Sequence, residues 1–529
     1  MLLEQESLAV QKGFQRLEAI SLEKTTPSGA QFLTQAGILE ISFYAPGMIR
    51  LKCELQPEND YQLLVSPAQQ VAVTVREIPG GYCLTSGKTC LEILSGPLRL
   101  RLLEDDRLVL ESITDRGIQG ELRYSALAHG DEGWLFSFAL KSAEPIYGLG
   151  EKFSALNKRG QLINAWNRDA LGVNSEASYK NMPFAWSPEG WGLFLHTTAR
   201  VITSAGYAPW SHRTYITKLL DPNLDLFLIS AQNPAEILKK FTQLTGRAPL
   251  PPLWSYGVWM SRAYYRTAEE ILEVADQLRK RNLPCDVLTL DGRAWHKMET
   301  RFDFSWDPER YPDPAAFIQK LKEQNYQLCL WEYPYLSIRN PLFNELSQKG
   351  FFLRTPDGQT YLSRYLPEPF DTLVPHLMPS GIIDFTNPEA YAWYAEMHKA
   401  LFEIGVQVMK TDYGEAVPEE VVAHNGDSGK RLHNVYALLY NRCVYEASEQ
   451  AHKQGMVWGR AGWIGSQRYP IQWGGDPQVD WEGLAGSLRG ALSWGMSGVP
   501  FYAHDIGGFA IGNPHPDLLI RWAQAGIFA

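Results

Sequence analysis

Hydrophobic and polar residues alternate with a period of two through much of the first 245 residues of the chain. Clear examples are VAVTV at 71–75, LRLRL at 98–102 and GLFLH at 192–196, and turn-forming clusters such as IPGG at 78–81 separate these runs. Alternation of this kind is typical of strands that bury one face and expose the other. Short strands punctuated by turns predict an antiparallel β-sandwich over residues 1–245.

The pattern changes close to residue 246. A helix is expected at 233–245 (NPAEILKKFTQLT), and the proline-rich segment APLPPL follows at 248–253. From there on, strand-like runs alternate with helix-like runs to the end of the chain. We therefore expect two domains, a β-sandwich at 1–245 and a catalytic domain at 246–529.

The second half predicts a parallel (β/α)8-type barrel, because strands and helices alternate over a long stretch. Two helix starts are marked clearly: Thr267 with Glu270 has the spacing of a capping box, and Asp313 precedes a proline at the first helical position. The expected strands are 254–260, 286–290, 327–331, 406–410, 456–460, 471–473 and 499–503. These are seven strands, so the barrel is expected to lack its last strand in this chain.

Composition excludes several classes of function. The chain has 529 residues, 45% of them hydrophobic, and a formal net charge of -10, which argues against a nucleic-acid partner. No apolar run is long enough to span a bilayer, which needs about 20 residues, so no membrane partner is expected. The six cysteines are scattered and MLLEQESLAVQ is unlike a signal peptide, so we expect a cytoplasmic protein without a disulfide framework or zinc site.

Polar or aromatic residues stand at the ends of successive predicted strands in the second half. One carboxylate in such a place commonly caps the next helix, but a whole series is harder to explain in that way. In a parallel barrel these ends converge on the catalytic face. Two carboxylates there, Asp412 and Asp476, provide a nucleophile and a proton donor for cleaving a glycosidic bond. The series comprises Asp291, Trp331, Asp412, Arg460, Asp476, His504 and Asp505.

Several long motifs resemble those of glycoside hydrolase family 31, the retaining α-glucosidases and α-xylosidases. KTDYGEAVP at 410–418 is similar to the family's nucleophile segment, especially in its α-xylosidase form. GRAGWIGSQRYPIQWGGD at 459–476 resembles the segment that ends with the acid/base aspartate. YGLGEKF at 147–153, DFTNP at 384–388 and HDIGGF at 504–509 are further matches in the same order.

This resemblance implies that Asp412 is the nucleophile and Asp476 the general acid/base of a double displacement. Lys410 would hold the pKa of Asp412 down, and glycines 474 and 475 would permit a close approach of the backbone before Asp476. Glu415 is expected to support the loop after the nucleophile. The substrate-binding residues implied are Asp291, Trp331, Lys410, Arg460, Trp473, His504, Tyr264 and, from the β-rich half, Asp169.

The expected partner is an oligosaccharide or small α-glycoside, hydrolysed without cofactor or metal, and assembly of identical chains stays open. Lys410 favours an α-xylosidase slightly over an α-glucosidase. However, Gly292 leaves space for a larger sugar and Arg293 suits an anionic one, so glucosidase and sulfoquinovosidase-like activities remain alternatives. The other alternative is a non-catalytic carbohydrate-binding relic. Since the family normally continues beyond a segment such as RWAQAGIFA, we expect a truncated chain that is unstable or inactive alone.

Overall fold

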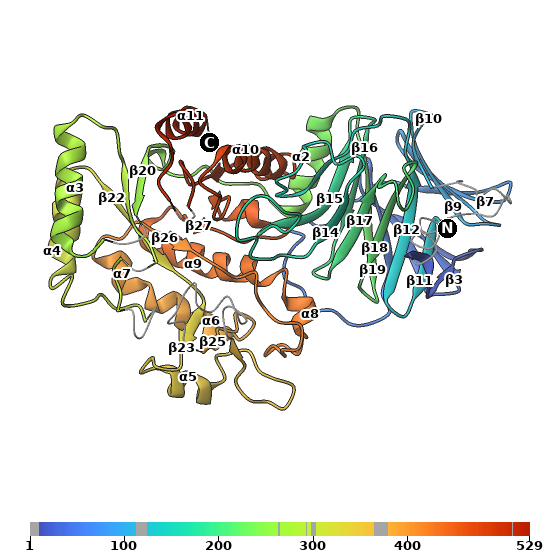
Figure 1. The fold of residues 1–529 in the computed structure, drawn as a ribbon. Helices are drawn as coiled ribbons and strands as arrows, with labels where there is room; N and C mark the ends of the chain where they lie inside the picture. The colour runs from blue at the N-terminus through green and yellow to red at the C-terminus, as the bar shows by residue number, and fades with distance from the viewer. Residues whose placement is uncertain are drawn as a thin grey trace. The chain divides into compact units, whose positions relative to one another are not determined.

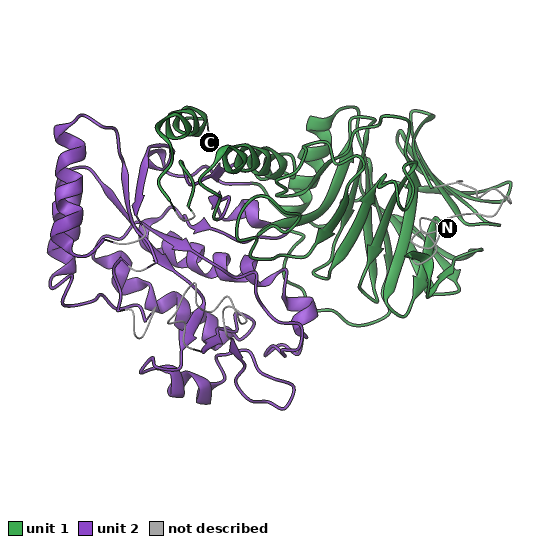
Figure 2. Ribbon diagram, in the orientation of Figure 1, with its two compact units in different colours: residues 1–247, 476–500, 506–528 green, residues 248–475, 501–505, 529 purple. Residues whose placement is uncertain are grey.

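The computed structural model describes residues 10–112, 124–262, 265–292, 294–297, 303–363, 379–509 and 512–528. It divides into two compact units (Figure 2). Unit 1 comprises residues 1–247, 476–500 and 506–528, and unit 2 comprises 248–475, 501–505 and 529. The domains expected at 1–245 and 246–529 stay a prediction.

Unit 1 contains three antiparallel sheets, which confirms the predicted β-sandwich class (Figure 1). The six-stranded sheet has the order β1 (Phe14–Arg16), β11 (Leu127–Gly130), β12 (Gly133–Ala139), β18 (Thr214–Leu219), β17 (Val201–Ala205), β14 (Leu162–Ala165). The eight-stranded sheet has the order β13 (Tyr147–Gly150), β15 (Asn181–Ser187), β16 (Trp191–Leu195), β19 (Leu224–Ser230), β5 (Met48–Cys53), β4 (Gly37–Ala45), β3 (Gly29–Thr34), β2 (Ser21–Thr26). The five-stranded sheet has the order β10 (Arg107–Glu111), β9 (Arg99–Glu104), β8 (Thr89–Leu94), β7 (Gly81–Ser86), β6 (Thr74–Ile78).

The helices of unit 1 that lie wholly among the described residues are α2 (Pro234–Thr245), α10 (Trp481–Gly495) and α11 (Pro516–Gly526). Helix α2 covers the eight-stranded sheet, where the Phe241 ring stacks on Phe184 with centroids 3.8 Å apart. Helix α10 packs against β13 through small residues. Its Ser493 hydroxyl donates to the Gly150 carbonyl at 2.7 Å, and a Cβ atom at Gly486 would lie only 2.7 Å from Val173. The glycines and serines of α10 therefore permit a close helix–sheet contact.

Unit 2 is built on a parallel sheet of seven strands that follow one another in chain order, as expected for a barrel without its last strand. The strands are β20 (Trp259–Arg262), β21 (Val287–Leu290), β22 (Gln327–Glu332), β26 (Val408–Thr411), β27 (Trp458–Gly459), β28 (Gln472–Trp473) and β29 (Tyr502–Ala503). The helices are α3 (Ala268–Lys280), α4 (Pro314–Glu323), α5 (Phe343–Lys349), α6 (Pro388–Met397), α7 (Lys399–Glu403), α8 (Gly429–Leu432) and α9 (Tyr436–His452), with short 3-10 turns η1 (Leu253–Tyr256) and η3 (Ser466–Arg468).

Both predicted helix starts in unit 2 have the expected caps. The Thr267 hydroxyl accepts from the Glu270 backbone N–H at 3.3 Å, and the Asp313 carboxylate accepts from the Ala316 N–H at 2.9 Å. These caps satisfy N–H groups that have no partner within the helix. Helices α3 and α4 lie next to each other at the left of Figure 1.

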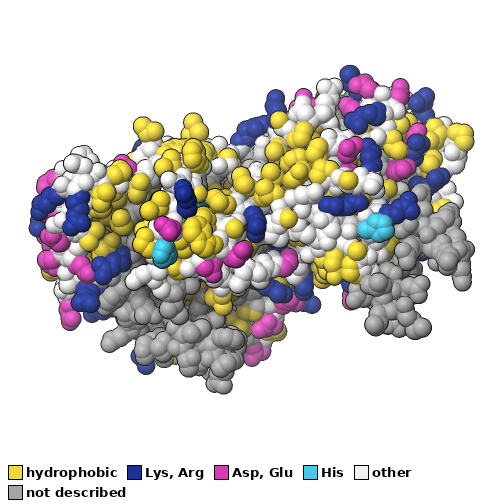
Figure 3. All heavy atoms as spheres, turned by 45° about the horizontal axis from the view of Figure 1, so that its top comes forward, with side chains coloured by type: hydrophobic (Ala, Val, Ile, Leu, Met, Phe, Trp, Pro, Cys, Tyr) yellow, Lys and Arg dark blue, Asp and Glu magenta, His cyan; other side chains and the backbone are white. Residues whose placement is uncertain are grey.

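The strand expected at 254–260 is wrong in its first half. Residues Leu253–Tyr256 form η1, because the chain turns after Pro252, whose carbonyl accepts from the Ser255 N–H and hydroxyl at 2.9 and 2.7 Å. Regular strand begins only at Trp259. The turn leaves large apolar side chains in solvent, with Leu253 88% exposed. Figure 3 shows hydrophobic groups gathered between charged ones on one face of the molecule.

A small antiparallel sheet interrupts the barrel pattern between β22 and β26. It has the order β23 (Tyr335–Ser337), β25 (Ser380–Ile382), β24 (Leu362–Ser363), and it lies near α5 at the bottom of Figure 1. A Cβ atom at Gly381 would meet the Phe352 ring at 2.7 Å, so the glycine in β25 allows this ring to pack on the strand.

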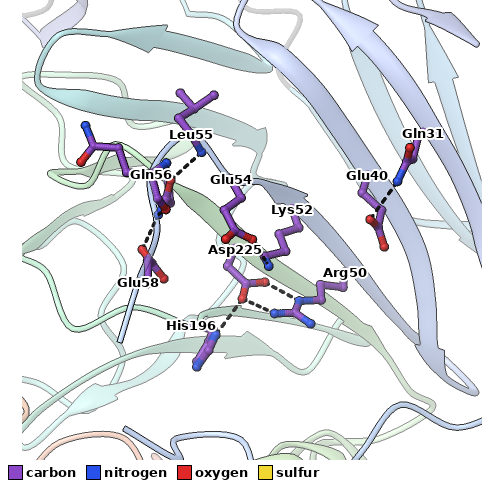
Figure 4. Close-up of polar contacts among 11 residues, drawn as sticks. Gln31, Glu40, Arg50, Lys52, Glu54, Leu55, Gln56, Glu58, His196 and Asp225 are labelled. Carbon is purple, nitrogen blue, oxygen red and sulfur yellow. Dashed lines mark hydrogen bonds and ion pairs between the residues drawn. The ribbon is translucent and has the colours of Figure 1, made fainter. Parts of the chain in front are cut away.

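A charged cluster joins two adjacent central strands of the eight-stranded sheet in unit 1 (Figure 4). Arg50 on β5 donates from Nε and Nη2 to the two oxygens of Asp225 on β19, at 2.7 and 2.6 Å. His196 Nδ1 lies 2.7 Å from the same carboxylate. Burial alone would raise the pKa of Asp225, but the hydrogen bonds from Arg50 and His196 outweigh it and lower that pKa. Asp225 therefore contributes stability above the ordinary aspartate pKa, which is lost as the pH falls through its folded value.

We predict that Asp225→Asn lowers the free energy of unfolding by about 2–3 kcal/mol at neutral pH, because it leaves a largely buried guanidinium without its counter-charge. Lys88→Gln is the matched control, because Lys88 and Asp105 form an exposed pair whose loss should change the free energy of unfolding much less. Urea unfolding followed by tryptophan fluorescence measures both. Equal effects of the two substitutions would contradict the prediction.

Candidate active site

The carboxyl ends of the parallel strands in unit 2 lie along one edge of the sheet, because the strands pair in parallel register. Trp331 on β22 pairs with Lys410 on β26, and Lys410 in turn pairs with Trp458 on β27. This edge is where barrels of this class place their chemistry. The predicted site residues on it are Asp291, Trp331, Lys410, Asp412, Arg460, Trp473 and His504.

Two hydrogen-bond donors and one ion-pair partner hold the carboxylate of Asp412. The Trp331 indole N–H donates to Oδ2 at 2.8 Å, the Tyr413 backbone N–H donates to Oδ1 at 2.9 Å, and Arg460 Nε lies 3.0 Å from Oδ1. The Asp412 backbone N–H donates to the Glu332 carbonyl at 3.0 Å. These contacts fix the orientation of the Asp412 side chain. The side chain is 14% exposed, so it still reaches the surface.

Arg460 connects Asp412 to Glu415. Its Nη2 donates to the Glu415 carboxylate, and both side chains are almost fully buried. The guanidinium also lies 4.2 Å from the centre of the Tyr413 ring. Tyr413 adopts a positive φ of 62°, which is unusual for a residue with a bulky side chain. Backbone strain of this kind often marks a functional site, and here it occurs directly after Asp412.

The direct ionic partner of Lys410 is Asp291, rather than the expected Asp412. Lys410 Nζ donates to Asp291 Oδ2 at 2.6 Å, and the Gly292 N–H donates to Asp291 Oδ1 at 2.7 Å. Burial alone would lower the pKa of Lys410, but the negative charges of Asp291, Asp505 and Asp412 raise it above its ordinary value. The ammonium therefore stays charged at neutral pH.

Two tryptophan rings that contact each other lie next to this ammonium. Lys410 Nζ is 4.6 Å from the Trp473 ring centre and 4.9 Å from that of Trp458. Trp473 is fully buried and contacts Trp458. Gly474 follows it, and a Cβ atom there would lie 2.2 Å from the Tyr502 hydroxyl. The close approach that this glycine permits is therefore to Tyr502.

His504 and Asp505 follow the last strand, and burial shifts both of them toward their neutral forms. Burial lowers the pKa of His504 to about 4, so its imidazole is neutral near pH 7. Burial raises the pKa of Asp505 to about 6, and the charges of Asp291 and Asp412 act in the same direction against Lys410. Asp505 therefore takes up a proton at a higher pH than an ordinary aspartate does.

A second buried pair lies behind β22. The Glu332 carboxylate lies 2.7 Å from His398 Nε2, within hydrogen-bond distance. His398 Nδ1 lies 2.7 Å from the Tyr394 carbonyl. A carbonyl only accepts, so Nδ1 carries a proton. Both side chains are fully buried. Because the Glu332 carbonyl holds the Asp412 N–H, this pair fixes the strand end beside which Asp412 stands.

Two further predicted residues belong to unit 1. The Asp476 backbone N–H donates to the Tyr179 hydroxyl at 3.4 Å, and its side chain is partly buried. Asp169 lies in the loop after β14, and its carboxylate accepts from the Leu171 N–H at 3.2 Å. Tyr264 and Arg293 lie outside the described residues.

Sequence reasoning missed Glu332, His398 and Trp458. Each stands in or beside a hydrophobic run, where it looks like an ordinary core residue. The only available signal was for Glu332, a charged residue at the end of the buried run QLCLWE. Among the residues that the structure describes, no group of three or more His, Cys, Asp or Glu side chains has metal-binding geometry.

Two family models match the chain. The model described as the glycosyl hydrolases family 31 TIM-barrel domain covers residues 248–529, which is more than half of the chain. The model described as the glycosyl hydrolase 31 N-terminal galactose mutarotase-like domain covers residues 38–202.

Individual relatives agree with these matches. An α-xylosidase of Emericella nidulans is 37% identical over 399 residues, which are 74% of this chain and 49% of the relative. Alpha-glucosidase 2 of Bacillus thermoamyloliquefaciens is 28% identical over 524 residues, 94% of this chain and 63% of the relative. A family 31 dextranase structure from Flavobacterium johnsoniae, complexed with glucose, shares the fold with a TM-score of 0.88 at 23% identity, over 97% of this chain and 64% of its own.

The chain spans between about half and two thirds of the length of these relatives. No helix among the described residues is both long and apolar enough to cross a membrane. The family models, the order of the strands and the carboxylates at the strand ends lead to the same conclusion: this chain belongs to glycoside hydrolase family 31.

Proposed function

We propose that the protein is a retaining, exo-acting α-glycoside hydrolase that releases a terminal α-linked xylose or glucose from an oligosaccharide. The observation that carries this proposal is the Asp412 carboxylate, held by Trp331, Arg460 and the Tyr413 N–H at the carboxyl edge of a parallel sheet. A nucleophile must present one oxygen to the anomeric carbon from a fixed position. These three contacts restrict Asp412 in that way.

The proposed reaction is a double displacement. In the first step Asp412 attacks the anomeric carbon, and Asp476 gives a proton to the departing oxygen. In the second step Asp476 takes a proton from water, and that water displaces Asp412 from the sugar. The role of Asp476 is proposed from its place at the end of the motif GRAGWIGSQRYPIQWGGD.

The other groups at the edge would bind the terminal sugar. Asp291 accepts hydrogen bonds and Lys410 donates them, and each holds the other in place. A neutral His504 can donate to or accept from a hydroxyl. Trp331 and Arg460 orient Asp412 while they border the same space. Tyr264 and Asp169 remain proposals for an apolar wall and for the leaving-group side, respectively.

Xylose is proposed slightly ahead of glucose as the terminal sugar. The α-xylosidase relative is more similar than the α-glucosidase relative, at 37% against 28% identity. Gly292 weakens the preference, because Trp331 is the one described residue that a Cβ atom there would contact, at 3.8 Å. A hydroxymethyl group in such a space changes binding by only about 1–3 kcal/mol, so the two sugars should differ by a ratio and not absolutely.

A non-catalytic carbohydrate-binding protein is the second candidate. It would need the sugar-binding groups but no fixed nucleophile. The strained Tyr413 and the contacts of Trp331, Arg460 and the Tyr413 N–H with Asp412 favour the enzyme, because together they orient one carboxylate.

A prediction for Asp412 and the substrate is tested with the full-length natural protein. Aryl α-xyloside should be hydrolysed faster than aryl α-glucoside or α-sulfoquinovoside. Asp412→Ala should reduce every rate by at least about 10⁴-fold and leave sugar binding intact. Azide should restore turnover of the variant and yield a β-glycosyl azide, because azide replaces the nucleophile in a single displacement.

Glu323→Gln, which changes an exposed carboxylate on α4, is the matched control and should keep full activity. Retained activity in Asp412→Ala would contradict the assignment of Asp412 as the nucleophile. Sugar binding without turnover by the unsubstituted protein would favour the binding-protein alternative instead.

The second prediction concerns Asp476. Asp476→Asn should lower the rate on alkyl glycosides by about 10²–10⁴-fold, since their leaving group needs a proton. Aryl glycosides with acidic phenols should lose much less in the first step. Azide should here give the α-glycosyl azide, because it attacks the sugar already bound to Asp412. A β product from this variant would refute the assigned roles.

The third prediction concerns the charge of Asp505. Its folded pKa of about 6 exceeds the unfolded value near 3.9, so the stability it contributes at low pH is lost as the pH rises through about 6. Asp505→Asn cannot ionise. The free energy of unfolding of Asp505→Asn minus that of the unsubstituted protein should therefore increase by about 1–2 kcal/mol from pH 5 to pH 8.

Urea unfolding at both pH values measures this difference, and Glu323→Gln gives the background for a surface carboxylate. A constant difference between Asp505→Asn and the unsubstituted protein across this range would show that Asp505 ionises like an exposed aspartate.

A further inference from the structure

Two cysteines of unit 1 face each other across neighbouring strands of the five-stranded sheet. Cys83 lies on β7 and Cys90 on β8. Their direct cross-strand partners are Glu92 and Thr85, so the cysteines are diagonal neighbours on one face of the sheet. Strand side chains alternate between faces, which places all four of these residues on the same side.

The two sulfur atoms are in close contact. Cys83 Sγ lies 2.6 Å from Cys90 Sγ and 3.3 Å from the Thr85 hydroxyl. This sulfur–sulfur distance is nearer to the disulfide length of about 2.05 Å than to the separation of about 3.5–4.0 Å typical of unbonded heavy atoms. Both residues are free cysteines. Because their sulfur atoms are already 2.6 Å apart, a small movement would suffice to join them.

The surroundings favour an uncharged product over a thiolate. Burial raises the pKa of Cys90 to about 12, and the contact with Cys83 acts in the same direction. A disulfide carries no charge and needs no hydrogen-bond donor, so this environment does not oppose it. Cys90 is only partly buried, which leaves a route for a small oxidant.

The remaining cysteines cannot compete for either sulfur. Cys53, Cys285, Cys329 and Cys443 are all buried, and no contact joins any of them to another cysteine among the described residues. Cys53 is the nearest in chain order and lies on β5, which belongs to a different sheet.

We propose that Cys83 and Cys90 form a redox modification site that a low-molecular-weight disulfide, of the oxidised-glutathione class, converts to a reversible cross-strand disulfide. The Cys90 thiolate attacks one sulfur of the oxidant and releases one small thiol. The Cys83 thiolate then attacks Cys90 Sγ and releases the second small thiol. The two cysteines are oxidised by two electrons, the oxidant is reduced to two thiols, and two protons pass from the cysteines to the products.

The disulfide would close a loop of eight residues within the β7–β8 hairpin. Such a bond fixes the register of the two strands. Both cysteines lie in unit 1, so no residue of unit 2 takes part. The site is therefore independent of the proposed glycosidase reaction. A reducing agent should reopen the bond, because a partly exposed disulfide is accessible to attacking thiols.

The test incubates the folded protein with oxidised glutathione for a prolonged time at about pH 9, where the small thiolate fraction of Cys90 is larger than at neutral pH, and counts thiols after denaturation. The count should fall from six to four, with a mass loss of about 2 Da and a linked peptide that contains Cys83 and Cys90. Dithiothreitol should restore six thiols.

Variants separate this site from non-specific oxidation. Cys83→Ser should stop closure and leave Cys90 carrying one glutathione, whereas Cys53→Ser should still close the Cys83–Cys90 bond. Six thiols after prolonged oxidation, or a linked peptide that contains another cysteine, would overturn the proposal. Loss of two thiols without bound glutathione in Cys83→Ser would also overturn it, because two other cysteines would then have formed a disulfide.

Discussion

The buried guanidinium of Arg460 determines the geometry of the candidate site. It is 1% exposed and contacts two carboxylates, those of Asp412 and Glu415. A cation removed from water in this way is tolerated only when it is paired and hydrogen-bonded. Asp412 follows β26 and Arg460 follows β27, so the ion pair joins the ends of two neighbouring strands. The strained turn at Tyr413 packs on the same guanidinium, and its conformation is therefore coupled to the orientation of Asp412.

Local signals in the sequence were enough to predict much of the fold. Thr267 and Asp313 cap α3 and α4 where the pattern placed them, because capping depends on residues only three apart. Period-two alternation identified the sheets of unit 1. The strand expected from residue 254 failed because hydrophobicity alone does not separate a strand from a turn that leaves Leu253 exposed. The small sheet of β23, β24 and β25 was missed because its strands are only two or three residues long.

The candidate site shows the same division between local and distant information. That Asp291, Asp412 and Arg460 stand at strand ends follows from the sequence, since each comes directly after a hydrophobic run. Which groups pair with which does not, because residues 119 apart in the chain meet in the contact of Lys410 with Asp291. Likewise, Glu332 and His398 are 66 residues apart, and no local pattern connects a strand end with the junction between two helices.

The charges at this edge also agree with the proposed chemistry. Among the described residues discussed above, Lys410 and Arg460 face the carboxyl groups of Asp291, Asp412, Glu415 and Asp505. If all four carboxyl groups ionised, the set would carry an excess of two negative charges. Burial raises the pKa of Asp505 to about 6, so protonation of this group reduces the excess as the pH falls through that value. A small negative excess remains, and it is suited to the positive charge that develops on a sugar ring as its glycosidic bond breaks.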